Sequence, residues 1–274
     1  MRSLALLALL SGCGRLGFAG DATSNGDGDV GDDARVCTPI GHDEDGDGID
    51  DGCDGCPSVA DSEQLDSDGD GVTEPCDPRP TIAGDKIASF EGFGGADGFT
   101  LPSPWTGEGA ASVQDDDVVL PATIGTRDAA ILSPVALGQT DLFRWSGIIA
   151  VGSCTSSEHA TIEMSALDGV KNLYCEIFNS NGGTGVLQLS WTFDSVNYFS
   201  RGQGFLTPDI VGAEGVLQMT HDGTGAQTTC DATWAGGTNG ISALTPDNIP
   251  LDVLRLTMHE VTGRIHWFIH IQVP

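Results

Sequence analysis

Two acidic blocks decide the architecture of the first part of this chain: Asp43-Glu-Asp-Gly-Asp-Gly-Ile-Asp-Asp-Gly-Cys-Asp54 and Asp66-Ser-Asp-Gly-Asp-Gly-Val-Thr-Glu-Pro-Cys-Asp77. At an offset of 23 residues the blocks match in their first, third, fifth and twelfth acids, in the glycine at position 6 and in the cysteine at position 11. Position 9 is acidic in both blocks. An in-register match of this length indicates a repeated structural unit, so the region is read as two copies of one loop.

The spacing of the acids favours a calcium site in each block. Oxygen ligands at positions 1, 3 and 5 of a tight loop converge on one point, and glycine at position 6 permits the sharp turn. A backbone carbonyl at position 7 and acids at positions 9 and 12 complete a flexible all-oxygen shell, which suits calcium better than magnesium. A solvated acidic linker is the alternative, but a linker has no reason to repeat in register. The expected ligands are Asp43, Asp45, Asp47, Ile49, Asp51 and Asp54, and then Asp66, Asp68, Asp70, Val72, Glu74 and Asp77.

The residues around the acids distinguish between two kinds of calcium loop. An EF-hand has glutamate at position 12 and a helix on each side. Here position 12 is aspartate, and the flanking Gly-Cys-Pro57 and Pro-Arg-Pro80 do not start helices. The pattern D-x-D-x-D-G-x-x-D-x-C-D-x-C-P, followed by x-x-x-D-x-x-Q-x-D-x-D-x-D-G, resembles the thrombospondin type 3 repeat.

That resemblance implies a segment with almost no core, wrapped around calcium ions and held by disulfides between successive cysteines. Carried over to residues 37–81, it implies the pairs Cys37–Cys53 and Cys56–Cys76. Arg79 stands where a further cysteine would be, as expected where the repeats stop. Calcium would act structurally, turning a self-repelling acidic segment into a semi-rigid spacer.

The charge of the chain excludes one class of partner. The formal net charge is -29, and between Asp21 and Arg79 there are 19 acidic residues against two arginines. Such a segment repels nucleic acid and anionic membrane surfaces, so nucleic-acid binding is not expected.

The N-terminus indicates export. Residues 1–12 combine an arginine, a short apolar run and small residues, which is typical of a signal peptide. Leu10-Ser-Gly-Cys13 resembles a bacterial lipobox, which implies cleavage before Cys13 and lipidation of its thiol; an ordinary secretory signal with an incidental cysteine is the alternative. Residues 13–36 are rich in Gly, Asp, Ala and Ser and are expected to form a disordered tether. We therefore expect a lipoprotein at the outer membrane or cell surface.

From residue 82 to 274 the pattern changes to short alternating runs. Ala160, Ile162, Met164 and Ala166 alternate with polar residues, and further alternating sets are Leu173, Cys175 and Ile177; Leu187, Leu189 and Trp191; and Leu217 and Met219. Period-2 strands at short spacing predict an all-β sandwich with one face of each strand in the core. The order of motifs from Phe90-Glu-Gly-Phe onward resembles concanavalin-like (laminin-G-like) jelly rolls, which implies a lectin-like or ligand-binding module.

The last two strands are expected to form a hairpin. With Glu260-Val-Thr-Gly263 as the turn, His259 would pair with Arg264, and Ile265, Trp267 and Ile269 would face inward. The outward set would then be a candidate ligand face, since polar groups around an aromatic ring suit sugars or peptides. A plain solvated sheet face is the alternative. The candidate residues are Arg255, His259, Arg264, His266 and Phe268.

Catalytic motifs are weak. A β-glucan hydrolase of this fold would show Glu-x-Asp-x-x-Glu on one strand, but in the stretch from Glu158 to Glu163 the central position is Ala160. We therefore expect a non-enzymatic, calcium-binding protein with an adhesion-like role and a glycan or matrix ligand. Two alternatives stay open: a polysaccharide hydrolase with an unrecognised carboxylate pair, and a purely structural interaction domain.

Three cysteines remain in the second half, and the chain has an odd number once Cys13 is assigned to lipid. Cys175 and Cys230 both fall on apolar strand faces, which favours their pairing over one that involves Cys154. The sequence alone leaves the connectivity open.

Overall fold

The structure is a computed structural model, and it describes the chain from Cys37 onward with short gaps. The described residues are 37–95, 97–123, 125–150, 159–165, 171–180, 184–192, 198–206, 212–223, 227–234, 237–244 and 252–274. The expected signal peptide, the lipidation site Cys13, the tether and Cys154 lie outside these residues.

All regular structure among the described residues is β-strand. The strands are β1 (Lys86–Glu91), β2 (Thr106–Glu108), β3 (Ser112–Gln114), β4 (Asp117–Pro121), β5 (Arg127–Leu132), β6 (Thr140–Ala150), β7 (His159–Ser165), β8 (Asn172–Ser180), β9 (Thr184–Thr192), β10 (Tyr198–Leu206), β11 (Glu214–Asp222), β12 (Gln227–Trp234), β13 (Gly237–Leu244), β14 (Val253–His259) and β15 (Thr262–Val273). In the described part of the chain no helical segment is long and apolar enough to cross a membrane.

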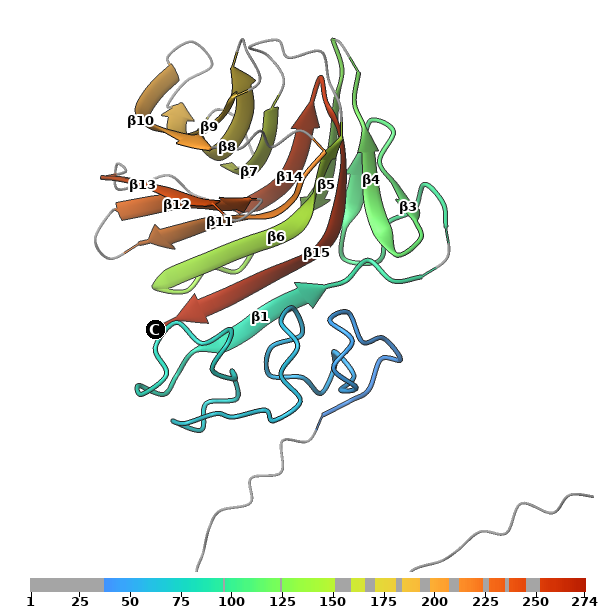
Figure 1. The fold of residues 1–274 in the computed structure, drawn as a ribbon, viewed down its shortest axis with the longest axis vertical. Coiled ribbons are helices and arrows are strands. Elements are labelled where there is room, and N and C mark those ends of the chain that lie inside the picture. Colours follow the sequence, from blue (N-terminus) through green and yellow to red (C-terminus); the bar gives the residue numbers. More distant parts are fainter. Residues whose placement is uncertain are drawn as a thin grey trace, which may run out of the picture. The chain divides into compact units, whose positions relative to one another are not determined.

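The strands form two antiparallel sheets that pack face to face (Figure 1). The eight-stranded sheet runs β13-β12-β11-β6-β15-β4-β3, and β1 pairs with β15. The seven-stranded sheet runs β10-β9-β8-β7-β14-β5-β2. The all-β sandwich expected from the alternating runs is therefore confirmed.

The core lies between the two sheets and is built from the apolar sides of the alternating strands. Ile162 of β7, Leu189 of β9 and Met219 of β11 are fully buried in one cluster with Trp145. Because side chains on a strand alternate between faces, every second residue of these strands enters the core, as the sequence predicted. A disulfide joins Cys175 of β8 to Cys230 of β12, so it links the two sheets and confirms the favoured pairing.

The expected hairpin at the C-terminus is wrong. β14 belongs to the seven-stranded sheet, between β7 and β5, and β15 belongs to the eight-stranded sheet, between β6 and β4. The turn at residues 260–261 therefore carries the chain from one sheet to the other. Both strands alternate apolar and polar residues equally well in either arrangement, so the pattern does not distinguish a hairpin from a crossing between sheets.

A β-bulge in β15 reverses the direction in which the side chains of its second half point, so the prediction for these residues is wrong. Ile265 pairs with Gly147 and Trp267 with Ser146, so His266 is an extra residue on this strand. An extra residue shifts the alternation by one. Consequently Phe268 enters the core between the sheets, while Trp267 and Ile269 turn to the other face of the eight-stranded sheet.

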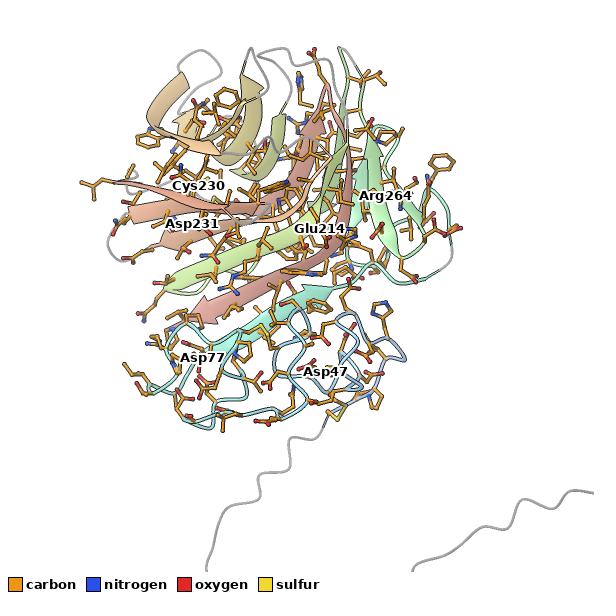
Figure 2. All side chains as sticks on the ribbon, viewed as in Figure 1. Asp47, Asp77, Glu214, Cys230, Asp231 and Arg264 are labelled. Carbon is orange, nitrogen blue, oxygen red and sulfur yellow. A yellow bond between two sulfur atoms is a disulfide. The ribbon has the colours of Figure 1, made fainter. Side chains whose placement is uncertain are left out.

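Residues 37–85 lack regular strands and pack as an irregular layer on that other face, beside β1 and β15 (Figures 1 and 2). The disulfides Cys37–Cys53 and Cys56–Cys76 are both present, as the resemblance implied. Val72 and the second disulfide form a buried cluster with Ile269 and Ile271. The segment is thus attached to the sandwich by its own small apolar core, rather than extending away from it as a spacer.

Candidate metal centres and a polar sheet face

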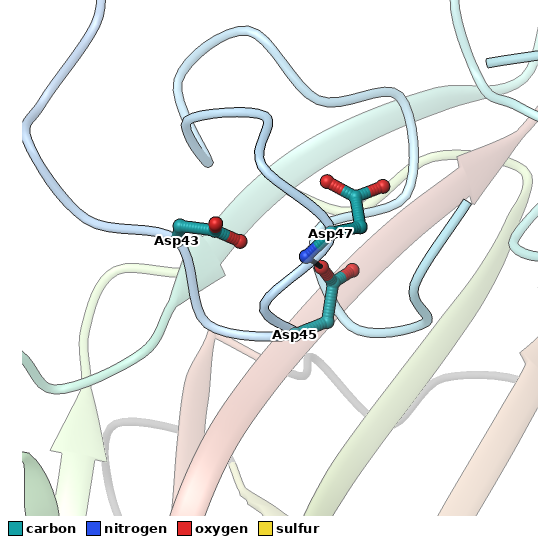
Figure 3. A group of neighbouring side chains, drawn as sticks. All are labelled: Asp43, Asp45 and Asp47. Atoms are coloured by element: carbon teal, nitrogen blue, oxygen red, sulfur yellow. Dashed lines mark hydrogen bonds between the residues drawn. The ribbon is translucent and has the colours of Figure 1, made fainter. Parts of the chain in front are cut away.

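The first acidic loop brings three carboxylates together (Figure 3). Asp43, Asp45 and Asp47 each offer an oxygen, and these atoms lie within 4.8 Å of one another. The loop closes on itself because Asp43 accepts hydrogen bonds from the backbone N–H groups of Gly46 (2.9 Å) and Gly48 (3.0 Å). Both glycines have positive φ, of 75° and 94°, which side-chain-bearing residues rarely adopt.

The second loop repeats this geometry. Oxygens of Asp66, Asp68 and Asp70 again lie within 4.8 Å of one another. Asp66 accepts hydrogen bonds from the N–H groups of Gly69 and Gly71, both at 2.8 Å. The glycines have φ of 79° and 96°, close to the values in the first loop. Two loops 23 residues apart in sequence therefore present the same converging oxygens.

The acids expected at position 9 differ between the two loops. The Oδ2 atom of Asp51 is 2.6 Å from His42 Nδ1, and its Oδ1 accepts a hydrogen bond from the Glu44 N–H (2.9 Å). Both carboxylate oxygens of Asp51 therefore contact neighbouring residues of the loop, and Asp51 is not in the three-carboxylate cluster. In the second loop, Glu74 Oε1 is buried with no hydrogen-bond partner among the described residues, so it is available to a cation.

The acids at position 12 each have one buried carboxylate oxygen without a hydrogen-bond partner among the described residues. Asp54 uses Oδ1 to accept hydrogen bonds from the Cys56 N–H and Gln64 Nε2, both at 2.7 Å. Its Oδ2, like that of Asp77, is buried and has no hydrogen-bond partner among the described residues. At position 7, Val72 is expected to bind through its carbonyl, and its side chain has a second role in the apolar cluster. Ile49 holds the same position in the first loop and donates its N–H to Asp47 Oδ1 (2.8 Å).

The electrostatics of the loops fit a bound cation. Burial, with neighbouring carboxylates of the same loop, raises the pKa of Asp45 to about 6. Burial raises the pKa of Asp54 and of Asp68 as well. Buried carboxylate oxygens without partners are rare because desolvation is costly. A hard cation supplies the missing interaction, and oxygen-only donor sets suit calcium. The residues present therefore fit such an ion.

Two further acids that the sequence analysis did not include among the candidate ligands have a buried carboxylate oxygen. Asp61 and Asp85 each have a buried Oδ2 with no hydrogen-bond partner among the described residues. The Asp61 N–H donates to Asp47 Oδ2 (2.8 Å), and the Asp85 N–H donates to Asp70 Oδ2 (2.6 Å). Asp61 belongs to the repeat pattern and could have been found there. Asp85 lies beyond the last expected repeat, so no sequence signal marked it.

The candidate ligand face predicted from the hairpin is not one face. Arg255 and His259 lie on β14 in the seven-stranded sheet, whereas Arg264 and His266 lie on β15 in the eight-stranded sheet. Phe268 is fully buried in the core. Arg264 and His266 both contact Asp117, at 2.8 and 2.6 Å. Arg255 belongs to a larger polar group.

That group covers the outer face of the seven-stranded sheet. Glu163 of β7 lies between Arg127 of β5 (3.5 Å) and Arg255 of β14 (3.6 Å), and Arg255 also donates to Ser165. On the next strand, Glu176 accepts hydrogen bonds from Gln188 Nε2 and Ser190 Oγ of β9, both at 2.8 Å. Burial raises the pKa of Glu163, and the two arginines oppose that effect. The side chains are thus held in place by one another. We name Arg127, Glu163, Ser165, Glu176, Gln188, Ser190 and Arg255 the polar face.

Comparisons with known proteins support the fold alone. No protein-family model matches the chain, and no curated protein matches it in sequence. Among solved structures, the chain is similar to the CBM2 module of the evolved Dit of Lactobacillus casei BL23 phage J-1, with a TM-score of 0.50, 9% identity, and coverage of 68% of this chain and 95% of that chain. The carbohydrate recognition domain of Emp47p gives a TM-score of 0.47, with 10% identity over 64% of this chain and 91% of that chain. A lectin from Bauhinia forficata gives 0.45, with 14% identity over 61% and 92%. At 9% identity, the similarity to the phage module shows that this chain shares its β-sandwich fold.

Proposed function

We propose that this chain is an exported calcium-binding protein whose β-sandwich binds a polar, glycan-like ligand in an adhesion role. In this proposal two loops of the thrombospondin type 3 kind hold calcium. A lipid on Cys13 anchors the chain at the outer membrane or cell surface, and residues 13–36 hold the folded part away from it. The chain acts by binding and catalyses no reaction.

The observation that carries calcium binding is the duplicated loop geometry. Three carboxylates converge within 4.8 Å in each loop, and further carboxylate oxygens beside them are buried without hydrogen-bond partners among the described residues. Calcium takes six to eight oxygens at about 2.3–2.6 Å, a shell that these acids and nearby carbonyls can form. The ion would neutralise the repulsion among the acids and fix the loops on the eight-stranded sheet.

Calorimetric titration of the exported chain with calcium tests this step. We expect binding of at least two ions per chain, and Asp45→Ala or Asp68→Ala to weaken it on the order of tenfold or more, because each removes a converging carboxylate. Glu63→Gln removes an exposed negative charge from the same segment and is the matched control. Unchanged calcium affinity in both alanine variants would reject the assignment of the loops.

The polar face supports a ligand of the glycan class. Its donors and acceptors include Arg127, whose side chain is 36% exposed, and they are fixed by their mutual contacts before any ligand arrives. Preformed polar groups limit the ordering that binding requires. Sugars present hydroxyl groups that both donate and accept, so a face with carboxylates, amides, hydroxyls and guanidinium groups matches them chemically.

Glycan-array binding by the exported chain tests the ligand. We expect Arg127→Ala to lower glycan binding at least tenfold, while Lys86→Ala, which removes an exposed cation from the other sheet, leaves it unchanged. Binding that both variants reduce equally would point to a general charge effect. No binding to any glycan would favour a structural interaction domain.

One observation favours hydrolysis as a second candidate. Glu163 and Glu176 lie on the same face of the neighbouring strands β7 and β8, and retaining glycosidases use two carboxylates about 5 Å apart. Against this, Glu163 is held by two arginines and Glu176 by Gln188 and Ser190. Release of reducing sugar from a polysaccharide by the wild-type chain, abolished in Glu163→Gln, would establish the enzyme instead.

A further inference from the structure

Glu163 is a buried carboxylate of the polar face whose hydrogen-bonding capacity is unused. Its side chain is 6% exposed, and its oxygens lie 3.5 Å from Arg127 Nη1 and 3.6 Å from Arg255 Nη1. Both distances exceed the ~3.2 Å that is usual for an N–H···O hydrogen bond. Glu163 accepts no hydrogen bond from the described residues. Its charge is therefore balanced, while its oxygens are buried without donors, which is a costly state.

The two arginines also have unused donors. The Nε–H groups of Arg127 and Arg255 are buried without an acceptor in the described part of the chain. Arg255 donates to Ser165 Oγ, whereas Arg127 makes ion pairs only, with Glu163 and with Glu108 (3.8 Å). The Arg127 side chain is 36% exposed. Because no hydrogen bond fixes its guanidinium group, Arg127 can turn toward a ligand and open the way to Glu163.

Two threonines beside this group add further unmet polar atoms. Thr161 of β7 and Thr257 of β14 are 2% and 3% exposed, and neither hydroxyl has a hydrogen-bond partner among the described residues. The two residues pair directly across the strands, next to the Glu163–Arg255 pair. Residues two apart on a strand point to the same face, so both hydroxyls belong to the face that carries Glu163.

The charges of the polar face favour a neutral ligand. Arg127 and Arg255 supply two positive charges, and ionised Glu163 and Glu176 supply two negative ones, so these charges cancel. A carboxylate on the ligand would lie against Glu163, and two carboxylates in contact repel. A cationic group would meet the two arginines in the same way. An uncharged ligand that carries hydroxyl groups avoids both penalties.

A pair of adjacent hydroxyl groups matches the unmet donors and acceptors. One hydroxyl can donate to Glu163 while its neighbour accepts from an N–H group of Arg127, because these two protein groups lie side by side at 3.5 Å. Each hydroxyl both donates and accepts, so hydrogen-bonding capacity is left over for the two threonines. A single hydroxyl has only one proton to donate and cannot satisfy the whole set.

We propose that the polar face selects neutral saccharides in which two adjacent hydroxyl groups are free, and that Glu163, between Arg127 and Arg255, sets this specificity. The proposal rests on the proposed function, which it narrows from glycans in general to one chemical class. Acidic saccharides are excluded because their carboxylates would meet the buried carboxylate of Glu163.

The test is binding of the wild-type chain to immobilised linear polysaccharides at neutral pH. One group contains 1,4-linked glucan, mannan, galactan and xylan, whose units keep two adjacent free hydroxyls. The second group is 1,3-linked glucan, whose inner units have no adjacent free pair. The third group contains polygalacturonate and polymannuronate, which add carboxylates. We expect at least tenfold tighter binding to one member of the first group than to any member of the other two.

Each other result has a definite meaning. Equal or tighter binding to the 1,3-linked or the acidic chains would overturn this proposal and keep the proposed function. No binding to any polysaccharide would reject both. Periodate cleaves the bond between adjacent hydroxyl-bearing carbons, so oxidation and reduction of the preferred polysaccharide should abolish binding. Retained binding after this treatment would also overturn the proposal.

A variant tests the role of Glu163. Glu163→Gln keeps the size of the side chain and removes its charge, so we expect at least tenfold weaker binding to the preferred neutral chain and a gain of binding to polygalacturonate. Glu108→Gln is the matched control, because it removes an acid beside Arg127 whose side chain is 47% exposed, and it should leave the preference unchanged. An unchanged preference in folded Glu163→Gln would overturn the assignment of Glu163. If this variant does not fold, the wild-type measurements still decide the ligand class.

Discussion

The β-sandwich and the repeat segment (residues 37–85) form two layers of this molecule, and different interactions stabilise each layer. The sandwich buries a continuous apolar core that includes Trp145, Phe143 and Phe268, and its strands satisfy one another's backbone groups. The repeat segment has no regular strand, and its apolar core consists of Cys56, Val72 and Cys76 against the sheet. Its backbone N–H groups are satisfied largely by aspartate side chains. The sandwich is therefore stabilised by its apolar core and its strand pairing. The repeat segment depends on its disulfides and, in our proposal, on its bound ions.

The largest expected effect is that calcium removal separates the two layers. With a chelator present, backbone amides of residues 43–77 should exchange with solvent at least a hundredfold faster, because self-repelling carboxylates lose the ions that hold them. Amides of β6 and β11 should change little. Hydrogen exchange followed by mass spectrometry resolves the two regions, and equal acceleration in both would mean that the layers share one source of stability.

Breaking one disulfide in each layer sharpens the comparison. Cys175→Ser with Cys230→Ser opens a loop of 55 residues and should cost about 4 kcal/mol of sandwich stability. Cys56→Ser with Cys76→Ser opens a loop of 20 residues and should cost about 3 kcal/mol. We expect only the second pair of substitutions to weaken calcium binding. Thermal unfolding measures the stability of each variant, and calcium titration measures its calcium affinity. Loss of calcium binding in the variant with Cys175→Ser and Cys230→Ser would contradict the separation between the two layers.

The contact between the layers can be tested at Ile269. This side chain is fully buried beneath the repeat segment, so Ile269→Ala should cost about 3 kcal/mol in free energy of unfolding and lower calcium affinity. Leu244→Ala is the control, because Leu244 is 76% exposed and its truncation should change stability by less than about 0.5 kcal/mol. Chemical denaturation provides the measurement. A loss of stability without any change in calcium affinity would show that the layers are energetically independent.

The smallest expected effect is a decrease in calcium affinity as the pH falls. Burial raises the pKa of Asp45 and of Asp77 to about 6, so both are charged at pH 7.5 and increasingly protonated below pH 6. Protons then compete with calcium, and affinity should fall by on the order of tenfold per pH unit for each proton displaced. Titrations at pH 7.5 and pH 5 measure the fall. A constant affinity across this range would indicate that these carboxylates are not ligands.

The sequence predicted local patterns better than it predicted long-range placement. Alternation identified the core faces of β7, β8, β9 and β11, and the repeat identified the converging acids at positions 1, 3 and 5. The hairpin was wrong because alternation is the same whether adjacent strands pair or cross between sheets. The bulge at His266 then reversed the faces of Trp267 and Phe268. Asp85 was missed because its buried position depends on its contact with Arg79, which no repeat spacing encodes.

The central claim is that calcium holds the repeat segment as a layer on the sandwich. Small-angle scattering of the chain with and without a chelator tests this claim most directly. With calcium, residues 36–274 should have the radius of gyration of a compact unit, about 18 Å, plus the contribution of any preceding tether. On chelation we predict an increase of several ångström, reversed by added calcium. An unchanged radius of gyration, with calcium binding confirmed in the same sample, would contradict the account.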